Sequence, residues 1–130
     1  MAGYDTTGTT LAFACYELAK NSDIQDKLRQ EIEDVLDGDS DKNLSYDDLQ
    51  TMTYLDQIIS ETLRFHNPAA LIQRVTTREY KFPGTDLVLP KDAIVWFNSY
   101  AIHMDPKYYS EPHTFNPDNF SKESKAKRHP

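Results

Sequence analysis

The residues of this chain that could transfer protons stand near its start. Asp5 is followed by the hydroxyl side chains of Thr6 and Thr7, shortly before an apolar run that begins at Leu11. A carboxyl group beside a hydroxyl group in apolar surroundings can pass protons, because both groups can donate and accept once water reaches them. The same three residues are also typical of a helix N-terminus with solvated threonines, and the tripeptide alone favours that structural interpretation.

A carboxylate and a guanidinium follow at Glu61 and Arg64. Three residues along a helix bring such groups together on one face, and this face points away from the apolar stripe of Leu55, Ile59 and Leu63. Taken alone, the pair predicts a surface contact that contributes about 0.2–0.5 kcal/mol.

Side chains that bind soft metals are sparse. Cys15 is the only cysteine, so the sequence excludes an internal disulfide framework and a multi-cysteine zinc site. It lies in an apolar run, where a cysteine usually behaves as a small core residue. The histidines lack metal-ligand spacing and are predicted in loops or turns; they are His66, His103, His113 and His129.

The charge of the chain argues against a nucleic-acid partner. Its 130 residues hold 14 basic and 21 acidic side chains, a net charge of −7, whereas nucleic-acid recognition needs a basic face. Residues 23–50 hold ten acids and three bases, which predicts a solvated helix and loop. No apolar run approaches the ~20 residues of a transmembrane helix, and the first residues do not resemble a secretory signal.

The first helix must position Asp5 and Thr6. Threonine and glycine are poor residues for a helix interior, so propensity starts this helix near Thr9. Residues 11–20 are apolar almost all round, which predicts burial on most sides.

Further helical segments are expected before residue 68. Serine and threonine caps mark their starts, and a helix ends before Pro68 because the residue preceding proline leaves the helical region. They are predicted over 23–36 with a capping box at Ser22 and a stop at Gly38, over 45–49, and from Thr53 onward.

The pattern changes to a period of two after residue 68. Strands rich in β-branched and aromatic residues are predicted over 72–77, 80–82, 87–89 and 93–100. Between them, Pro83 and Gly84 predict a type II turn. From His103 onward we expect irregular chain anchored by Phe115 and Phe120, with 122–128 as an exposed loop. The fold class is therefore mostly α with a small β-sheet (α+β).

Three motifs stand in the order found in the cytochrome P450 family. Residues 2–7 resemble the oxygen-activation motif of its long central helix, Glu61–Arg64 its Glu-x-x-Arg motif, and Pro117–Phe120 its Pro-Glu-Arg-Phe element. The resemblance covers essentially the whole chain and is similar to animal microsomal members, including arthropod ones. It implies one partial domain over 1–130: a helical part (1–68), a small sheet part (69–100), and a helix turn and meander (101–130) before the heme-ligand loop.

The resemblance implies a cofactor and residues that serve it. Heme would be bound, with Ala2, Gly3 and Thr6 close to the porphyrin. Asp5 and Thr6 would be the catalytic residues and would relay protons to dioxygen. Arg74 would pair with a heme propionate, which suits its fork of donors.

It further implies residues that support the heme loop and the substrate. Glu61 and Arg64 would be buried and would hold the heme-ligand loop in place. Asn119 stands where many members have an arginine, so it would contribute a hydrogen bond without a charge. A hydrophobic substrate would be lined by Ala69, Ala70, Leu71 and Ile72.

The implied activity is heme-thiolate monooxygenation. One oxygen atom would enter an apolar small molecule, with electrons from NADPH delivered by NADPH-cytochrome P450 reductase. The whole protein would be anchored at the cytoplasmic face of the endoplasmic reticulum membrane by a segment that this chain does not contain.

The family's thiolate comes from a cysteine loop downstream of Pro117–Phe120, and Cys15 lies on the wrong helix to replace it. We therefore expect a fragment without a metal ligand, inactive in isolation. Two alternatives stay open: a non-catalytic fragment without heme, and a small helical interaction module with Glu61 and Arg64 exposed.

Overall fold

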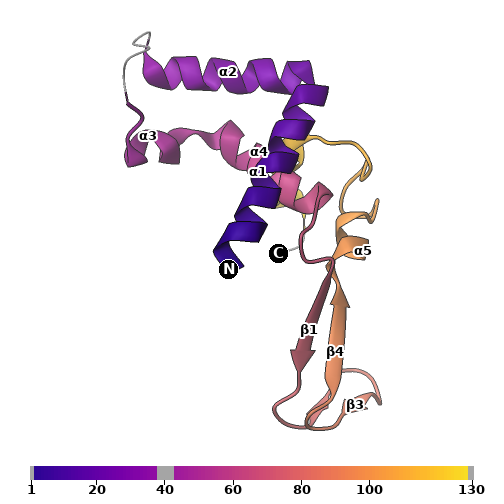
Figure 1. The fold of residues 1–130 in the computed structure, drawn as a ribbon. Coiled ribbons are helices and arrows are strands. Elements are labelled where there is room, and N and C mark those ends of the chain that lie inside the picture. The colour runs from indigo at the N-terminus through magenta and orange to yellow at the C-terminus, as the bar shows by residue number, and fades with distance from the viewer. Residues whose placement is uncertain (1, 38–42, 129–130) are drawn as a thin grey trace.

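The computed structural model describes residues 2–37 and 43–128, and it is mostly helical with a small antiparallel β part, as the sequence predicts. The helices pack together, and the strands project from them as a ribbon (Figure 1). The elements are α1 (Ala2–Lys20), α2 (Ser22–Leu36), α3 (Tyr46–Thr51), α4 (Thr53–Phe65), β1 (Leu71–Val75), β2 (Tyr80–Lys81), β3 (Val88–Leu89), β4 (Ile94–Asn98), α5 (Ser99–His103), the 3-10 helix η1 (Pro117–Phe120) and α6 (Lys122–Lys127). Among the described helices, none combines the length and apolar character needed to cross a membrane.

Helix α1 begins at Ala2, well before the start predicted near Thr9. The hydroxyl of Thr10 donates to the carbonyl of Thr6 at 2.8 Å, so a threonine in this stretch finds a partner inside the helix. Propensity is a weak guide where such bonds and packing against α4 favour the helix.

The predicted burial of α1 on most sides is wrong. Leu11 is 58% exposed, Tyr16 is 53% exposed, and Cys15 is exposed rather than in the core. Only the face of α1 that carries Ala14 and Glu17 is buried, and Leu11 and Tyr16 lie on faces that are exposed to solvent.

The N-terminal cap predicted at Ser22 does not form, whereas the one predicted at Ser45 does. Asn21 precedes α2, and its amide donates to the carbonyl of Glu17 at 2.8 Å, so the capping box expected at Ser22 does not form. Asp37 ends α2 with φ of 53°, while the predicted stop at Gly38 lies outside the described residues. Helix α3 does carry a capping box, built by Ser45.

The N-terminus of α4 is capped by a residue of α2. The amides of Tyr54 and Leu55 donate to the two carboxylate oxygens of Glu31 at 2.7 and 2.9 Å. A carboxylate at this position satisfies two amides that lack helical partners and favours the helix dipole. The cap expected from Thr53 is therefore supplied from another helix.

The core joins three segments that lie far apart in the sequence. It is formed by α2, α4 and the chain before η1, through Ile24, Leu28, Tyr54, Ile58 and Phe115. Phe115 is buried as expected, and Phe120 is half-buried. This packing places α4 in the middle of the helical part (Figure 1).

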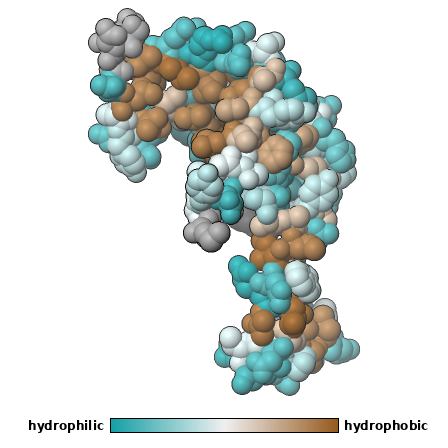
Figure 2. All heavy atoms as spheres, viewed as in Figure 1, coloured by the Kyte–Doolittle hydropathy of each residue, from teal (hydrophilic) through white to brown (hydrophobic). Residues whose placement is uncertain are grey.

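The strands form two separate two-stranded antiparallel sheets. In one, β1 pairs with β4 with Leu71 opposite Asn98, and in the other β2 pairs with β3. Gly84 has φ of +74° and the amide of Thr85 donates to the carbonyl of Phe82, which confirms the predicted type II turn. Figure 2 shows apolar side chains along this ribbon, where Trp96 is 58% exposed.

The C-terminal part is more regular than predicted. Residues 122–127 form α6 instead of an exposed loop, because the hydroxyl of Ser121 accepts the amide of Ser124 and caps the helix. Asn98 and Asn116 cap α5 and η1 in the same way.

Candidate functional site

Glu61 and Arg64 form a buried ion pair on α4. Their side chains are 0% and 1% exposed, and the guanidinium binds the carboxylate through two bonds of 2.7 Å, from Nε to Oε2 and from Nη2 to Oε1. The surface contact predicted from the spacing alone is wrong, because η1 and the chain before it cover this face of α4.

The guanidinium of Arg64 also binds the irregular chain between α5 and η1. It donates to the carbonyls of His103 at 2.8 Å, Pro112 at 2.9 Å and Thr114 at 3.3 Å, and it lies over the ring of Tyr109. One side chain of α4 thus binds the last residue of α5 and two points of the irregular chain that follows it.

The carboxylate of Glu61 completes this network from the other side. Its Oε1 accepts the backbone amide of Asn116 at 2.9 Å and the side-chain amide of Asn119 at 3.1 Å. Asn119 is therefore the third member of the cluster, and it contributes a hydrogen bond to Glu61 but no charge. A buried pair costs desolvation, so such a cluster is better suited to fixing a geometry than to adding net stability.

His103 lies beside this cluster, and the cluster affects the pKa of its imidazole. Burial lowers the pKa of its imidazole below the usual value, and the positive charge of Arg64 lowers that pKa further. The Nδ1 atom of His103 lies 3.2 Å from the side-chain nitrogen of Asn67, an amide donor that suits a neutral ring.

We therefore predict that acid destabilises this region through His103. Its pKa is lower in the folded than in the unfolded chain, so unfolding takes up protons and stability falls as the pH drops below about 6.5. Urea unfolding between pH 7 and about pH 5.5 should show a smaller loss for His103→Gln than for the wild type. An identical loss in both proteins would contradict this assignment.

The predicted catalytic residues lie on the opposite flank of α4. Thr6 lines a hollow of about 370 Å³ between α1 and α4, while Asp5 is exposed on the same helix. The hollow is lined by Thr6, Thr7, Thr10, Leu11, Ala14, Ile59, Leu63 and Pro68. Its hydroxyl groups lie at one end of an otherwise mainly apolar wall.

Gly3, Arg74 and most of the stretch 69–72 are open to solvent. Gly3 is exposed, and apart from its chain neighbours and the nearby backbone of α1, no described atom would lie within 4 Å of a side chain added there. Arg74 is exposed on β1 and donates to the carbonyl of Gln73 at 2.8 Å. The proposed substrate-lining stretch 69–72 is exposed except for Ile72, which is half-buried.

The chemistry of these residues suits a heme. The hollow between α1 and α4 offers an apolar wall with hydroxyl groups, and the guanidinium of Arg74, with five donors in all, can still pair with a carboxylate. Cys15 is not among the residues that line the hollow. Within residues 2–37 and 43–128, no three metal-binding side chains are grouped to hold an ion.

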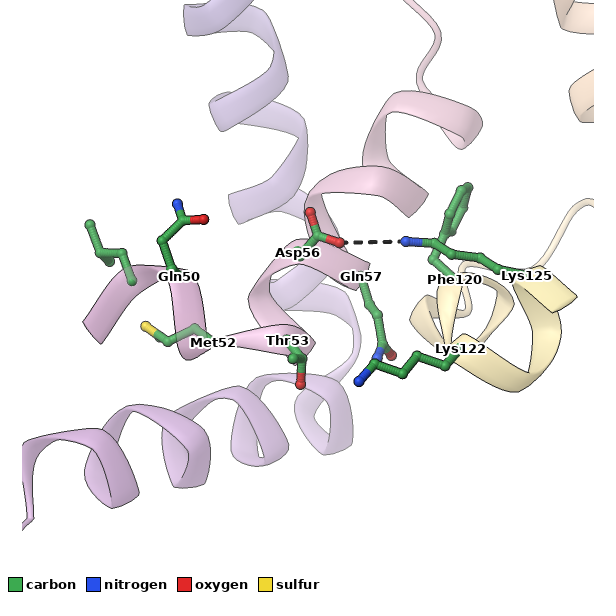
Figure 3. Close-up of a pocket in the computed structure, with 9 residues that line it drawn as sticks. Gln50, Met52, Thr53, Asp56, Gln57, Phe120, Lys122 and Lys125 are labelled. Carbon is green, nitrogen blue, oxygen red and sulfur yellow. Dashed lines mark ion pairs between the residues drawn. The ribbon is translucent and has the colours of Figure 1, made fainter. Parts of the chain in front are cut away.

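A second hollow, of about 260 Å³, lies between α3, α4, η1 and α6 (Figure 3). Figure 3 shows Lys125 reaching toward Asp56, with a distance of 3.6 Å from Nζ to Oδ2. None of the predicted site residues lines this hollow.

Fold and site together describe a helical domain with a small antiparallel β part, in which a buried Glu–Arg pair organises an irregular C-terminal segment. The family model for cytochrome P450 matches residues 1–130. The chain therefore belongs to the cytochrome P450 family.

The chain is similar over its whole length to insect members of that family. It is 46% identical to cytochrome P450 6B6 of Helicoverpa armigera, 45% to cytochrome P450 6B1 of Papilio polyxenes and 44% to the probable cytochrome P450 6a14 of Drosophila melanogaster. It spans 26% of the length of each of these relatives.

Proposed function

We propose that this chain is part of a heme-thiolate monooxygenase that inserts one atom of O2 into a hydrophobic small molecule. The observation that carries the proposal is the buried cluster of Glu61, Arg64 and Asn119, which binds four backbone groups of the segment 103–116. The small-module alternative required Glu61 and Arg64 to be exposed, and their burial argues against it.

Heme, when bound, supplies the activation of oxygen and its transfer to the substrate. In this proposal Thr6, which lines the hollow, and Asp5, the exposed residue before it on α1, hold and pass protons. The guanidinium of Arg74 would bind a heme carboxylate through paired hydrogen bonds. The stretch 69–72 would contact the substrate.

The same proposal names a partner and a place. Electrons would come from NADPH through NADPH-cytochrome P450 reductase, and the protein would work at the cytoplasmic face of the endoplasmic reticulum membrane. The insect relatives support a monooxygenase of this family, and the apolar lining of the hollow suits an apolar substrate.

The proposal is tested with the complete protein encoded by the gene. Purified protein is mixed with reductase, NADPH, ¹⁸O-labelled dioxygen and a panel of apolar small molecules, and products are analysed by mass spectrometry. We expect a product with one labelled oxygen that forms only when both reductase and NADPH are present. Heme-loaded protein that consumes NADPH but labels no product across the panel would count against the proposal.

A further inference from the structure

A second buried carboxylate lies on α1, in a part of the sequence that is otherwise apolar. Glu17 is 1% exposed, and its Oε1 lies 2.8 Å from Nε2 of His66, the residue that follows α4. Its Oε2 is 3.4 Å from the amide nitrogen of Asn21 and 3.7 Å from the ammonium of Lys20. The imidazole stacks on the ring of Phe13 at 4.1 Å.

The contact between Glu17 and His66 joins this carboxylate to the residue that directly follows α4. A carboxylate accepts hydrogen bonds, so Nε2 of the imidazole is the donor. Buried carboxylates are costly unless they are paired, and an apolar side chain would fill this position at lower cost. The pair therefore fixes the position of α1 relative to the end of α4.

The contact between Glu17 and His66 lies on the face of α1 that carries Thr6. The two residues are 17 − 6 = 11 positions apart, which is about three turns of 3.6 residues, so their side chains leave α1 in nearly the same direction. Thr10 lies between them on this face, and the hollow opens beside it. Ile59 of α4 also lines this hollow, so residues of α1 and α4 together enclose one space.

We propose that Glu17 and His66 are positioning residues that fasten α1 to α4 and thereby fix Thr6 relative to the wall formed by α4. The consequence for catalysis rests on the proposed function, since it assumes that Thr6 delivers protons. The claim that the pair holds α1 against α4 does not rest on the proposed function, because it concerns only the contact between these segments.

The test uses four variants of the complete protein. His66→Phe keeps the ring on Phe13 but removes the donor to Glu17, and His66→Gln keeps a donor without the ring. Lys20→Met is the matched control, because it removes an exposed contact to the same carboxylate. The double variant Glu17→Met with His66→Phe replaces the whole pair by apolar side chains.

Hydrogen exchange of the first half of α1 is the first readout. We expect exchange about tenfold faster in His66→Phe, since a buried acceptor has lost its partner. His66→Gln should stay closer to the wild type and Lys20→Met should match it. The second readout is product formed per NADPH consumed, which should fall in His66→Phe at unchanged heme content and recover in His66→Gln.

The two readouts separate the two claims. Equal exchange in His66→Phe and Lys20→Met would overturn the fastening. Faster exchange with unchanged product per NADPH would overturn the positioning of Thr6. A wild type that forms no product would refute the proposed function, while the exchange comparison would still decide the fastening. If His66→Phe does not fold, recovery of the fold in the double variant supports the pair and failure to recover overturns it.

Discussion

Replacing Glu61 by alanine is expected to lower the free energy of unfolding by about 3–5 kcal/mol and to prevent stable binding of heme. Arg64 would keep its charge at a site where it is 1% exposed, after losing the carboxylate that neutralises it. Asn116 and Asn119 would lose their acceptor at the same time. The segment 103–116 would then be held from one side only.

The experiment compares two ion pairs of the same helical spacing. Asp26 and Arg29 of α2 form an exposed pair three residues apart, so Asp26→Ala should cost less than about 1 kcal/mol. Urea unfolding and heme content are measured for both variants in the complete protein. A Glu61→Ala protein with the stability and heme content of Asp26→Ala would show that burial of the pair has no energetic consequence.

Thr6→Ala is expected to uncouple NADPH consumption from product formation. Substrate binding should stay nearly unchanged, because a methyl group can still line the hollow. Product per NADPH should fall about tenfold or more and peroxide should rise, since positioned proton transfer is worth about 10²–10⁴ in rate.

Thr9→Ala serves as the control for Thr6→Ala. Thr9 is also an exposed threonine of α1 but does not line the hollow, so its removal tests the general effect of losing a hydroxyl from this helix. Peroxide and product are measured in parallel for both variants. Equal coupling in the two would remove Thr6 from the proposed relay.

Features that depend on residues adjacent in the sequence were predicted better than features that depend on another helix. The turn at Pro83 and Gly84 and the cap at Ser45 depend on neighbouring residues, and both are present. The cap of α4 is different, because Glu31 reaches it from another helix. No pattern within α4 could indicate that partner, so Thr53 was the natural but wrong candidate.

The burial of Glu61 and Arg64 could likewise not be predicted from the residues near them in the sequence. A helical wheel placed them on a polar face, because the groups that cover them are largely backbone carbonyls and an amide of an irregular segment. Backbone groups carry no sequence signature, so only the family resemblance implied burial. Glu17 did leave a signal, as the one acid in the apolar run 11–20, but its partner His66 lies 49 positions away.

The most direct measurement is the absorption spectrum of the complete protein after reduction under carbon monoxide. The proposal that this chain belongs to a heme-thiolate enzyme predicts heme incorporation and the strongly red-shifted Soret band of a thiolate-ligated complex, with the band lost in Glu61→Ala. A complete protein that takes up no heme, or that shows the unshifted band of a heme without a thiolate ligand, would contradict it.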